Sequence, residues 1–366
     1  MKVIAQTAAL QEALTLASSI VAARSPKPVL QCAKLVAQNK TLTLLATDLE
    51  VACRYVIPQV DVQEDGEALV PVNRFFDIVR ESAGEDALTI AVAKDACTIT
   101  GAGARFKLLG YDPAEYPAVA EFEDAGDFQA PSVAIASLVE RTLFAAARAH
   151  SHYAISGVLW EATGKKLQLV ATDGHRLALA KASLPKAATR DVTAIVPAKL
   201  MALLQRLGGA AEETLAVKVT DSQVMIRTAR ATLISSLVQG NFPKYTDVIP
   251  RETTRKAVIK TQDLLHRIRQ AALLTSEESR GIRLSLTADC ARLTGRAPEA
   301  GEAEVEMPVT YTGEPLDIGF NPAFLIDALK VVQTDEVSLE FNASNKPAML
   351  KSGTDFLYVV MPVDLG

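Results

Sequence analysis

The chain repeats itself with a period of about 125 residues. The sequence Ala-Leu-Val-Pro ends at Pro71, Ala-Ile-Val-Pro ends at Pro197, 126 positions later, and Pro322 follows after another 125 positions. A second marker, Ala-Thr-Asp, ends at Asp48 and again at Asp173, also 125 positions apart. Solenoid repeats have units of about 20 to 50 residues, so a period this long predicts three copies of a whole domain. A chain that triplicates a scaffold is expected to build a shape.

The length agrees with three domains. At 366 residues the chain is too long for one ordinary core, and domains of roughly 100 to 150 residues are typical. The repeat predicts domains over residues 1–122, 128–250 and 254–366. The segment 119–131 is acidic and the segment 246–256 is polar, and we interpret both as connectors.

Each third divides again into two similar halves, each with a strand, a helix and further strands. In the first halves the short strands are expected at Val3-Ile4, at 133–135 and at 257–259. The expected helices cover residues 8–23, 73–82, 137–149, 198–207, 262–274 and 322–332. Apolar and polar residues alternate along the later strands, for example at 88–92 and 337–341, which is typical of antiparallel sheets with one buried face. The fold class is therefore α+β, with helices on one side of antiparallel sheets.

Composition excludes several classes of protein. No stretch approaches the roughly 20 apolar residues that span a bilayer, and the N-terminus has the pattern of a strand and an amphipathic helix instead of a signal peptide. We therefore expect a cytoplasmic protein. Cys32, Cys53, Cys97 and Cys290 stand far apart, so neither a metal site nor a disulfide framework is indicated. We expect no cofactor.

Charge is divided between the helices and the rest of the chain. The six expected helices, with Arg24 at the end of the first, carry ten Lys and Arg against six Asp and Glu, although the whole chain has a net charge of −5. If six units curved round an axis with their helices inward, a mildly basic wall would suit a phosphate backbone bound without sequence preference. Ordinary solvated helix faces would give the same count, and both interpretations remain open.

Four motifs resemble those of a known family. They are the Ala-Thr-Asp-Gly-His-Arg-Leu-Ala string within 169–178, the helix start at 71–77, Gly240-Asn-Phe-Pro243 with Tyr245, and the terminal Tyr-Val-Val-Met-Pro at 358–362. Together they resemble the bacterial DNA polymerase sliding clamp, the beta subunit of the replicative DNA polymerase III. The resemblance covers the whole chain at nearly the length of the family.

The resemblance implies the DNA clamp fold and a non-catalytic processivity factor. It implies a head-to-tail homodimer closed into a ring, with helices lining a hole that encircles double-stranded DNA and antiparallel sheets outside. Topological linkage would let the ring slide while it holds the polymerase near its primer end. The polymerase catalytic subunit, the clamp loader and repair proteins would bind through short linear peptides. No G-x-x-x-x-G-K-[ST] loop for ATP is present in the sequence.

The same resemblance implies three sets of site residues. A hydrophobic peptide-binding groove would be lined by Ile155, Thr172, Gly174, His175, Arg176, Leu177, Pro243, Val248, Asn321, Phe324, Val359, Met361, Pro362 and Val363. DNA would be contacted by Arg24, Arg80, Arg148, Tyr153, Lys199 and Arg206. The dimer interface would contain Arg74, Arg105, Phe106, Lys107, Leu273, Leu274, Glu299, Glu302 and Glu304.

The distribution of charge along the chain also favours closure of the ring. The strand around Arg105 and Lys107 is basic, and the segment from Glu299 to Glu306 in the third repeat is acidic. Sheet edges of opposite charge at opposite ends of one chain favour heterologous pairing between two copies.

The chain departs from the family at several positions. Asp247 and Asp364 stand where other members carry arginine, Ser279 stands where they carry an aromatic residue, and Gly366 extends the chain by one residue. These differences are expected to shift the peptide preference of the groove.

Two other functions remain as alternatives. Asp173, His175, His150 and His152 could form the metal site of a metal-dependent hydrolase, although no H-E-x-x-H pattern is present. A triplicated scaffold protein that does not bind DNA would share the same fold and would differ in its helix charge and its groove.

Overall fold

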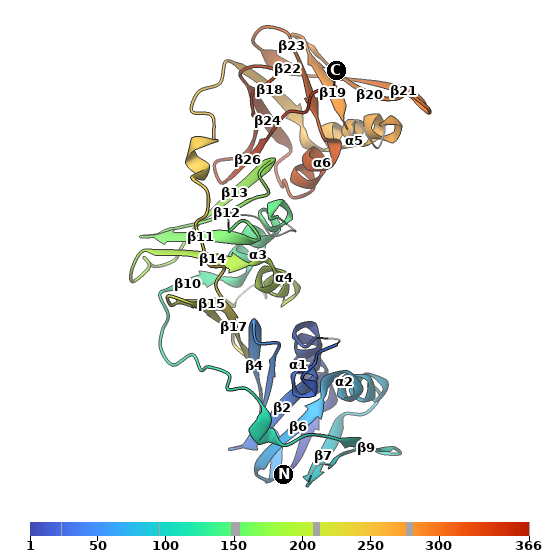
Figure 1. Cartoon of the computed structure of the whole chain (residues 1–366), viewed down its shortest axis with the longest axis vertical. Coiled ribbons are helices and arrows are strands. Elements are labelled where there is room, and N and C mark those ends of the chain that lie inside the picture. The colour runs from blue at the N-terminus through green and yellow to red at the C-terminus, as the bar shows by residue number, and fades with distance from the viewer. Residues whose placement is uncertain (23, 95, 148–153, 208–212, 276–280, 366) are drawn as a thin grey trace. The chain divides into compact units, whose positions relative to one another are not determined.

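The computed structural model describes residues 1–22, 24–94, 96–147, 154–207, 213–275 and 281–365 (Figure 1). Contacts divide the chain into two compact units. The first unit contains Met1–Val133 and Ala202–Leu237, and the second contains Ala134–Met201 and Val238–Gly366. Each unit is described by itself below.

The first unit contains two sheets. The smaller has the order β5 (Asp61–Glu64), β1 (Lys2–Gln6), β7 (Ala87–Ala93), β8 (Ala96–Thr100) and β9 (Arg105–Leu109). The larger has the order β10 (Phe128–Pro131), β15 (Thr214–Val219), β16 (Gln223–Arg227), β17 (Ala231–Ser236), β4 (Val51–Pro58), β3 (Thr41–Thr47), β2 (Cys32–Gln38) and β6 (Gly66–Pro71). Strands β17 and β4, which come from different repeats, pair with Leu233 opposite Cys53. One continuous sheet therefore joins parts of two repeats.

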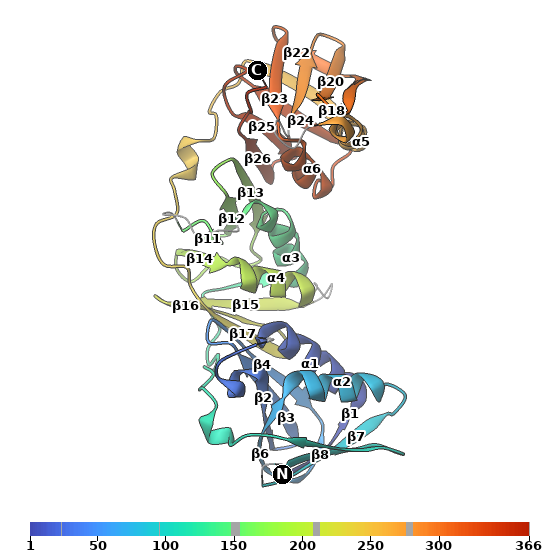
Figure 2. The ribbon, with the colours of Figure 1, turned by 45° about the vertical axis from the view of Figure 1, so that its right-hand side comes forward.

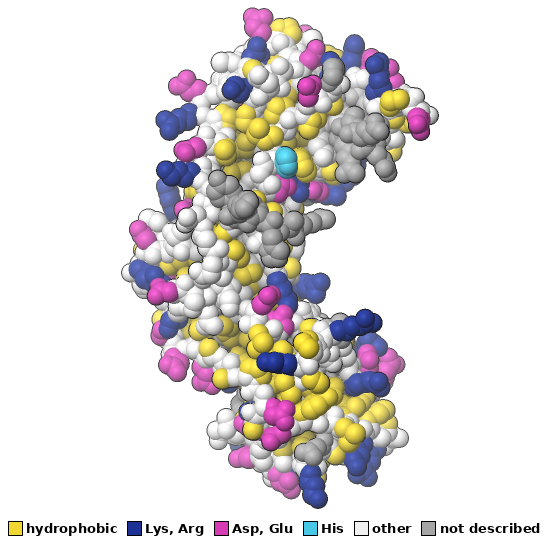
Figure 3. Space-filling model, in the orientation of Figure 1, with side chains coloured by type: hydrophobic (Ala, Val, Ile, Leu, Met, Phe, Trp, Pro, Cys, Tyr) yellow, Lys and Arg dark blue, Asp and Glu magenta, His cyan; other side chains and the backbone are white. Residues whose placement is uncertain are grey.

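Helices α1 (Thr7–Ile20) and α2 (Val72–Glu81) of this unit lie side by side (Figure 2). Helix α1 buries Leu10, Leu14 and Ala17, which recur at the helical spacing of three and four residues. Helix α2 buries Phe75 and Val79 in the same way and exposes its charged residues. Figure 3 shows Lys and Arg side chains over the α2 side of the unit, with acidic side chains among them. Short 3-10 turns lie at Pro28–Gln31 (η1) and Pro113–Glu115 (η2).

The second unit is built in the same way. Its larger sheet has the order β14 (Val192–Pro197), β11 (Gly157–Thr163), β12 (Lys166–Thr172), β13 (Arg176–Ser183), β26 (Phe356–Val360), β25 (Ala348–Ser352), β24 (Glu336–Phe341), β18 (Arg255–Lys260) and β22 (Thr310–Thr312). Its smaller sheet has the order β21 (Gly301–Pro308), β20 (Cys290–Ala297), β19 (Ile282–Leu286) and β23 (Leu316–Phe320). Helices α5 (Thr261–Ala271) and α6 (Pro322–Lys330) pack against each other. The 3-10 turns are η3 (Leu143–Ala145), η4 (Tyr245–Asp247) and η5 (Ala272–Leu274).

Most of the elements expected from the sequence are present. Every strand pair among the described residues is antiparallel, and the alternating segments 88–92 and 337–341 lie in β7 and β24. The helix expected at 137–149 is wrong, because α3 covers Ser132–Glu140 and the strand expected at 133–135 lies inside it. The short apolar run Val-Ala-Ile carries no period that separates a strand from a buried helix, and β10, which ends at Pro131, is the true strand. Helix α4 (Ala198–Leu207) lies where it was expected.

Among the residues that the structure describes, we find no helix with the length and apolar character needed to cross a membrane.

Candidate functional site

The candidate groove lies where the second and third repeats share a sheet. Strand β13 of the second repeat pairs with β26 of the third, with Leu177 opposite Val359. After β26 the chain continues as a tail, Met361–Leu365, which we call the C-terminal tail. The Met361 amide donates to the carbonyl oxygen of His175 at 2.9 Å, and the Val363 amide donates to that of Gly319 at 2.9 Å. The tail is thereby fixed to both repeats.

The turn that leads into β13 is held by its own side chains. The Thr172 hydroxyl donates to the carbonyl oxygen of Arg176 at 2.6 Å and accepts from the Gly174 amide at 3.1 Å. The Asp173 carboxylate accepts from the amides of His175 and Arg176 at 3.0 and 3.1 Å. Gly174 has a φ of +91°, in the left-handed region that glycine adopts without steric cost. Thr172 and Asp173 thus position the residues that follow them.

The first repeat contains the same turn. The Thr47 hydroxyl donates to the carbonyl oxygen of Val51 at 3.0 Å and accepts from the Leu49 amide at 3.0 Å. The Asp48 carboxylate accepts from the amides of Glu50 and Val51 at 3.1 and 2.8 Å, and Leu49 has a φ of +81°. The repeated Ala-Thr-Asp marker therefore encodes a backbone turn. The chemistry that distinguishes the second repeat lies in Gly-His-Arg, which replaces Leu-Glu-Val.

Arg176 lies at the centre of a buried polar contact, and its side chain is 9% exposed. Its guanidinium donates to Asp173 at 3.0 Å, to Asp327 on α6 at 2.8 Å and to the carbonyl oxygen of Phe144 at 2.8 Å. It also lies over the ring of Phe324, 4.5 Å from the centroid. Burial opposes the charged form, but the hydrogen bonds to the two carboxylates raise the pKa of Arg176 above its ordinary value. Arg176 is therefore a permanent cation at this site.

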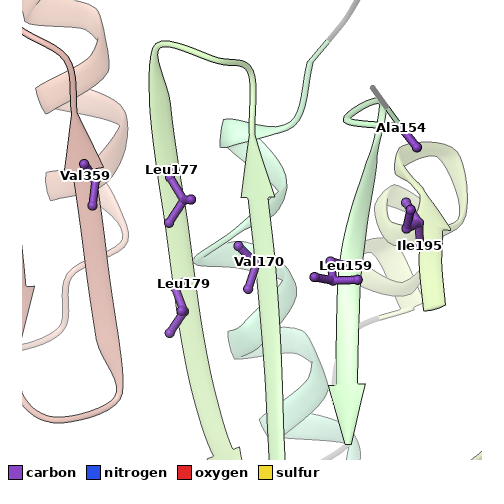
Figure 4. Packing of buried hydrophobic residues seen from close by; sticks show 7 residues of the cluster. All are labelled: Ala154, Leu159, Val170, Leu177, Leu179, Ile195 and Val359. Atoms are coloured by element: carbon purple, nitrogen blue, oxygen red, sulfur yellow. The ribbon is translucent and has the colours of Figure 1, made fainter. Parts of the chain in front are cut away.

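An apolar cluster lies beside this contact on the sheet (Figure 4). It consists of Ala154, Leu159, Val170, Leu177, Leu179, Ile195 and Val359, and we call it the groove cluster. Six of its members come from strands β11 to β14 of the second repeat and from β26 of the third, and Ala154 lies just before β11. Val238, Phe242, Tyr245, Ile249 and Leu357 are partly buried against it. The cluster thus has partly accessible apolar side chains along its rim.

A hydrogen-bonded triad fixes one side of the cluster. The Tyr245 hydroxyl donates to Glu161 at 2.7 Å, and the Gln168 amide donates to Glu161 and to Tyr245 at 2.6 Å each. Glu161 and Gln168 lie opposite each other on β11 and β12. Burial raises the pKa of the Tyr245 hydroxyl, and the bond to Glu161 raises it further. The triad therefore anchors the segment 242–248, where Val248 is 49% exposed.

We predict that Tyr245→Phe lowers the free energy of unfolding by about 1 to 3 kcal/mol, because a hydrogen bond to a charged group is lost while the ring stays in place. Urea denaturation measures this change. Tyr111→Phe is the matched control, since the Tyr111 side chain is 40% exposed. Equal stability of the two variants would contradict an anchoring role for Tyr245.

A cavity of about 490 Å³, which we call the tail cavity, lies against the C-terminal tail. Its lining consists of Arg283, Asp317, Ile318, Gly319, Ser344, Asn345, Met361, Pro362, Val363, Asp364 and Leu365. A side chain on Gly319 would meet the Val363 carbonyl oxygen at 2.4 Å, so glycine lets the tail lie close to β23. Met361 is 41% exposed at the edge of this cavity. Arg283, Ser344 and Asn345 were not expected from the sequence, because their positions depend on how β19 and the turn before β25 fold beside the tail.

All of the expected groove residues lie in the second unit. Thr172, Gly174, His175, Arg176, Leu177, Val359 and Met361 lie along the pairing of β13 with the end of β26, and Pro362 and Val363 line the cavity. Ile155 is buried beside Ala154 of the groove cluster, and Pro243 is half-buried. Asn321 caps α6 by accepting from the Ala323 amide at 3.0 Å, and the Phe324 ring stacks on His175 with centroids 6.4 Å apart.

The residues expected to contact DNA lie on different elements. Arg24, Arg80 and Arg206 are exposed in the first unit, and Lys199 is exposed in the second. Arg80 forms an ion pair with Asp77 at 3.0 Å, and Arg206 donates to the Ser19 hydroxyl at 3.4 Å. Arg148 and Tyr153 lie outside the described residues.

The expected interface residues lie mainly on two edge strands. Strand β9 is the last strand of its sheet, with Arg105 and Lys107 exposed and Phe106 half-buried. Strand β21 is likewise at an edge, and it exposes Glu302, Glu304 and Glu306. These glutamates already form ion pairs within the chain, Glu302 with Arg296 at 3.2 Å and the other two with Arg292 at 3.4 and 2.7 Å. Arg74 is exposed on α2, Glu299 is exposed in the turn before β21, Leu273 is 80% exposed and Leu274 is half-buried.

The part of the chain that the structure describes gives no support for a metal site. Within the described ranges, no group of three or more His, Cys, Asp and Glu side chains could hold a metal ion. Asp173, which was considered as a ligand, binds Arg176 and two backbone amides instead. His150 and His152 lie outside the described residues, as do Ser279 and Gly366.

Comparison with known proteins covers the whole chain. The family of the DNA polymerase III beta subunit matches through its N-terminal domain at residues 1–120, its central domain at 129–244 and its C-terminal domain at 246–364. The beta sliding clamp of Pseudomonas putida is 34% identical over 98% of this chain and 99% of its own, and that of Chlamydia muridarum is 30% identical over 95% and 94%.

Solved structures agree with these matches. The sliding clamp of Pseudomonas aeruginosa bound to griselimycin has a TM-score of 0.95 at 33% identity, and that of Bacillus subtilis has 0.96 at 26%, each over 100% of both chains. The three-domain clamp fold expected from the sequence is thereby confirmed. The chain belongs to the DNA polymerase III beta subunit family, the sliding clamps.

Proposed function

We propose that two copies of this chain join head to tail into a ring that encircles duplex DNA and tethers the replicative polymerase through the candidate groove. As a family member the chain is a non-catalytic processivity subunit of a DNA polymerase. Each copy would contribute three domains, over residues 1–122, 128–250 and 254–366. A ring that cannot leave its DNA keeps a weakly bound polymerase at high effective concentration. The place of such a protein is the cytoplasm.

The observation that supports peptide binding in the candidate groove is the exposure of apolar side chains beside the groove cluster and the tail cavity. Val248 is 49% exposed and Met361 is 41% exposed. Two or three apolar anchors of a peptide would each contribute roughly 1.5 to 3 kcal/mol on burial. After the cost of ordering the peptide, affinity of about micromolar strength is expected. Partners could then exchange on one ring, and the flexible thioether of Met361 suits peptides of different shape.

Complementary edge strands support the ring. On β9 the exposed positions carry Arg105 and Lys107, and on β21 the exposed positions carry Glu302, Glu304 and Glu306. Half-buried positions alternate with them, Phe106 on β9 and Val305 on β21. Antiparallel pairing of the two strands would set basic residues against acidic ones on one face and apolar residues together on the other. Two such junctions would close a dimer.

Retention on DNA tests the ring directly. Clamps assembled on a nicked circular duplex are expected to stay bound during gel filtration, and clamps on the linearised duplex are expected to run off its ends. Equal retention on the two forms would contradict encirclement. A scaffold protein without DNA binding would be retained on neither form.

We predict that Arg24 and Lys199, both of which are exposed, contribute to the affinity for duplex DNA. This contribution should depend on salt and should not depend on the DNA sequence. Replacing both with alanine should lower the affinity for linear duplex several-fold at low salt and reduce the slope of log K against log salt by about 1 to 2, because two phosphate contacts are lost. Fluorescence anisotropy at several salt concentrations measures both quantities. Lys346→Ala, a change on the turn before β25, is the matched control. An unchanged slope would exclude these two residues from the DNA contact.

A further inference from the structure

We propose that Arg176 is a positioning residue that locks the second repeat to the third and thereby sets the geometry of the groove, instead of binding the peptide itself. The inference rests on the proposed function of the groove. It assigns the same task to Asp327 and Phe144, which were not among the expected groove residues.

The contacts of Arg176 come from three separate elements. The residue itself begins β13, Phe144 lies in η3 of the second repeat, and Asp327 and Phe324 lie on α6 of the third. Each nitrogen of the guanidinium donates one hydrogen bond, to Asp173, Asp327 and the Phe144 carbonyl. The rings of Phe324 and Phe144 lie 4.5 and 5.6 Å from its central carbon. A guanidinium held in this way, with 9% of its side chain exposed, has little capacity left for a ligand.

Arg176 and its contact residues, which we call the lock, are connected to both repeats that form the groove. His175, the neighbour of Arg176, accepts the hydrogen bond from the Met361 amide and stacks its ring on Phe324. Tyr358 on β26 donates to the Phe324 carbonyl at 2.9 Å, and its ring lies 5.9 Å from that of Phe144. A shift of α6 relative to β13 would therefore displace Val359 from its position opposite Leu177 and Met361 from its position beside His175.

The first repeat contains the same turn without an arginine and can be compared with the second. Val51 stands in the place of Arg176, although the hydrogen bonds of the turn are repeated. Elsewhere in the first unit, a cleft of about 1330 Å³ opens between α1 and α4. Its walls include Leu16, Ser19, Leu203 and Arg206. An exposed ion pair between Glu12 and Arg230 at 2.7 Å crosses from α1 to the turn before β17. Exposed ion pairs stabilise a protein little. The buried contacts of Arg176 therefore hold the second and third repeats together more firmly than the Glu12–Arg230 pair holds the first and second.

Binding of a labelled clamp-binding peptide from a replicative polymerase, measured by anisotropy on the full-length dimer, tests the inference. Arg176→Gln is expected to lower affinity about tenfold or more, and Arg176→Lys less. Asp327→Asn and Phe144→Leu should lower affinity by the same route, and the R176Q/D327N double variant should lose little beyond R176Q, because the residues act as one unit. Arg230→Gln, which breaks the ion pair of the first junction, should leave affinity unchanged.

Hydrogen exchange supplies a second readout that a direct ligand contact would not alter. In the variants without peptide, the amides of β13 and β26 are expected to exchange faster, while those of β17 and β4 keep the wild-type rate. If D327N and F144L bind the peptide like wild type while R176Q does not, Arg176 contacts the ligand and the inference is wrong. Should R176Q fail to fold, R176K and D327N carry the same comparison. Absence of peptide binding by the wild-type dimer would instead reject the proposed function, whereas the exchange rates would still report on the lock.

Discussion

A chain whose last five residues, 362–366, are replaced by a Gly-Ser sequence is expected to lose at least a hundredfold in affinity for a clamp-binding peptide and to remain a dimer. Residues 362–365 line the tail cavity, and Val363 fixes the tail to β23 through its bond to Gly319. The loss of one or two apolar anchors corresponds to about 3 kcal/mol, and each 1.4 kcal/mol is a tenfold change in affinity.

Peptide anisotropy and sedimentation velocity measure the two properties. Val133→Thr changes another exposed aliphatic side chain, 44% exposed, and is the control for a general loss of surface hydrophobicity. Retained peptide binding by the tail variant would place the groove elsewhere. Loss of the dimer would mean that the tail also contributes to the interface.

Reversing the charge of β9 is expected to convert the dimer into monomers. In a chain with Arg105→Glu and Lys107→Glu, acidic residues of β9 would face the exposed Glu302, Glu304 and Glu306 of a second copy. Like charges placed together at an interface cost several kcal/mol, and a ring of two chains contains the contact twice. Sedimentation velocity at micromolar concentration should show a single monomeric species.

A complementary variant makes this prediction specific. A second chain with Glu304→Lys and Glu306→Lys should also be monomeric, because basic residues would then face Arg105 and Lys107. An equimolar mixture of the two variants should form dimers again, since both junctions of the mixed ring join opposite charges. If the mixture stays monomeric, or if either variant dimerises by itself, the two strands do not form the interface in the proposed way.

The sequence predicted the secondary structure where hydrophobic period and length agreed. The alternating segments 88–92 and 337–341 are strands, and the helix expected at 198–207 has those bounds. The error at 137–149 arose because Val133, Ala134 and Ile135 form an apolar run too short to show a period. Tertiary context decides such a segment, since β10 already provides the strand that precedes the helix.

The candidate site was predictable in part. The repeated Ala-Thr-Asp marker was visible in the sequence, but the sequence did not reveal that Thr172 and Asp173 hold the backbone of a turn. Phe144 and Asp327 were not expected, because each reaches Arg176 from an element far away in the sequence. Asn345 lines the tail cavity for the same reason. Contacts that depend on the packing of one repeat against another leave no local pattern in the chain.

The pairing of β13 with β26 has a consequence for synthesis of the protein. Strand β26 covers one edge of β13, so this edge stays without its partner until residues 356–360 have left the ribosome. An uncovered edge strand is a template for wrong pairing with other chains. The surface proposed to receive the polymerase can thus form only after β26 has been made. A product truncated before β26 is expected to aggregate or be degraded, so an incomplete clamp would not compete for the replication machinery.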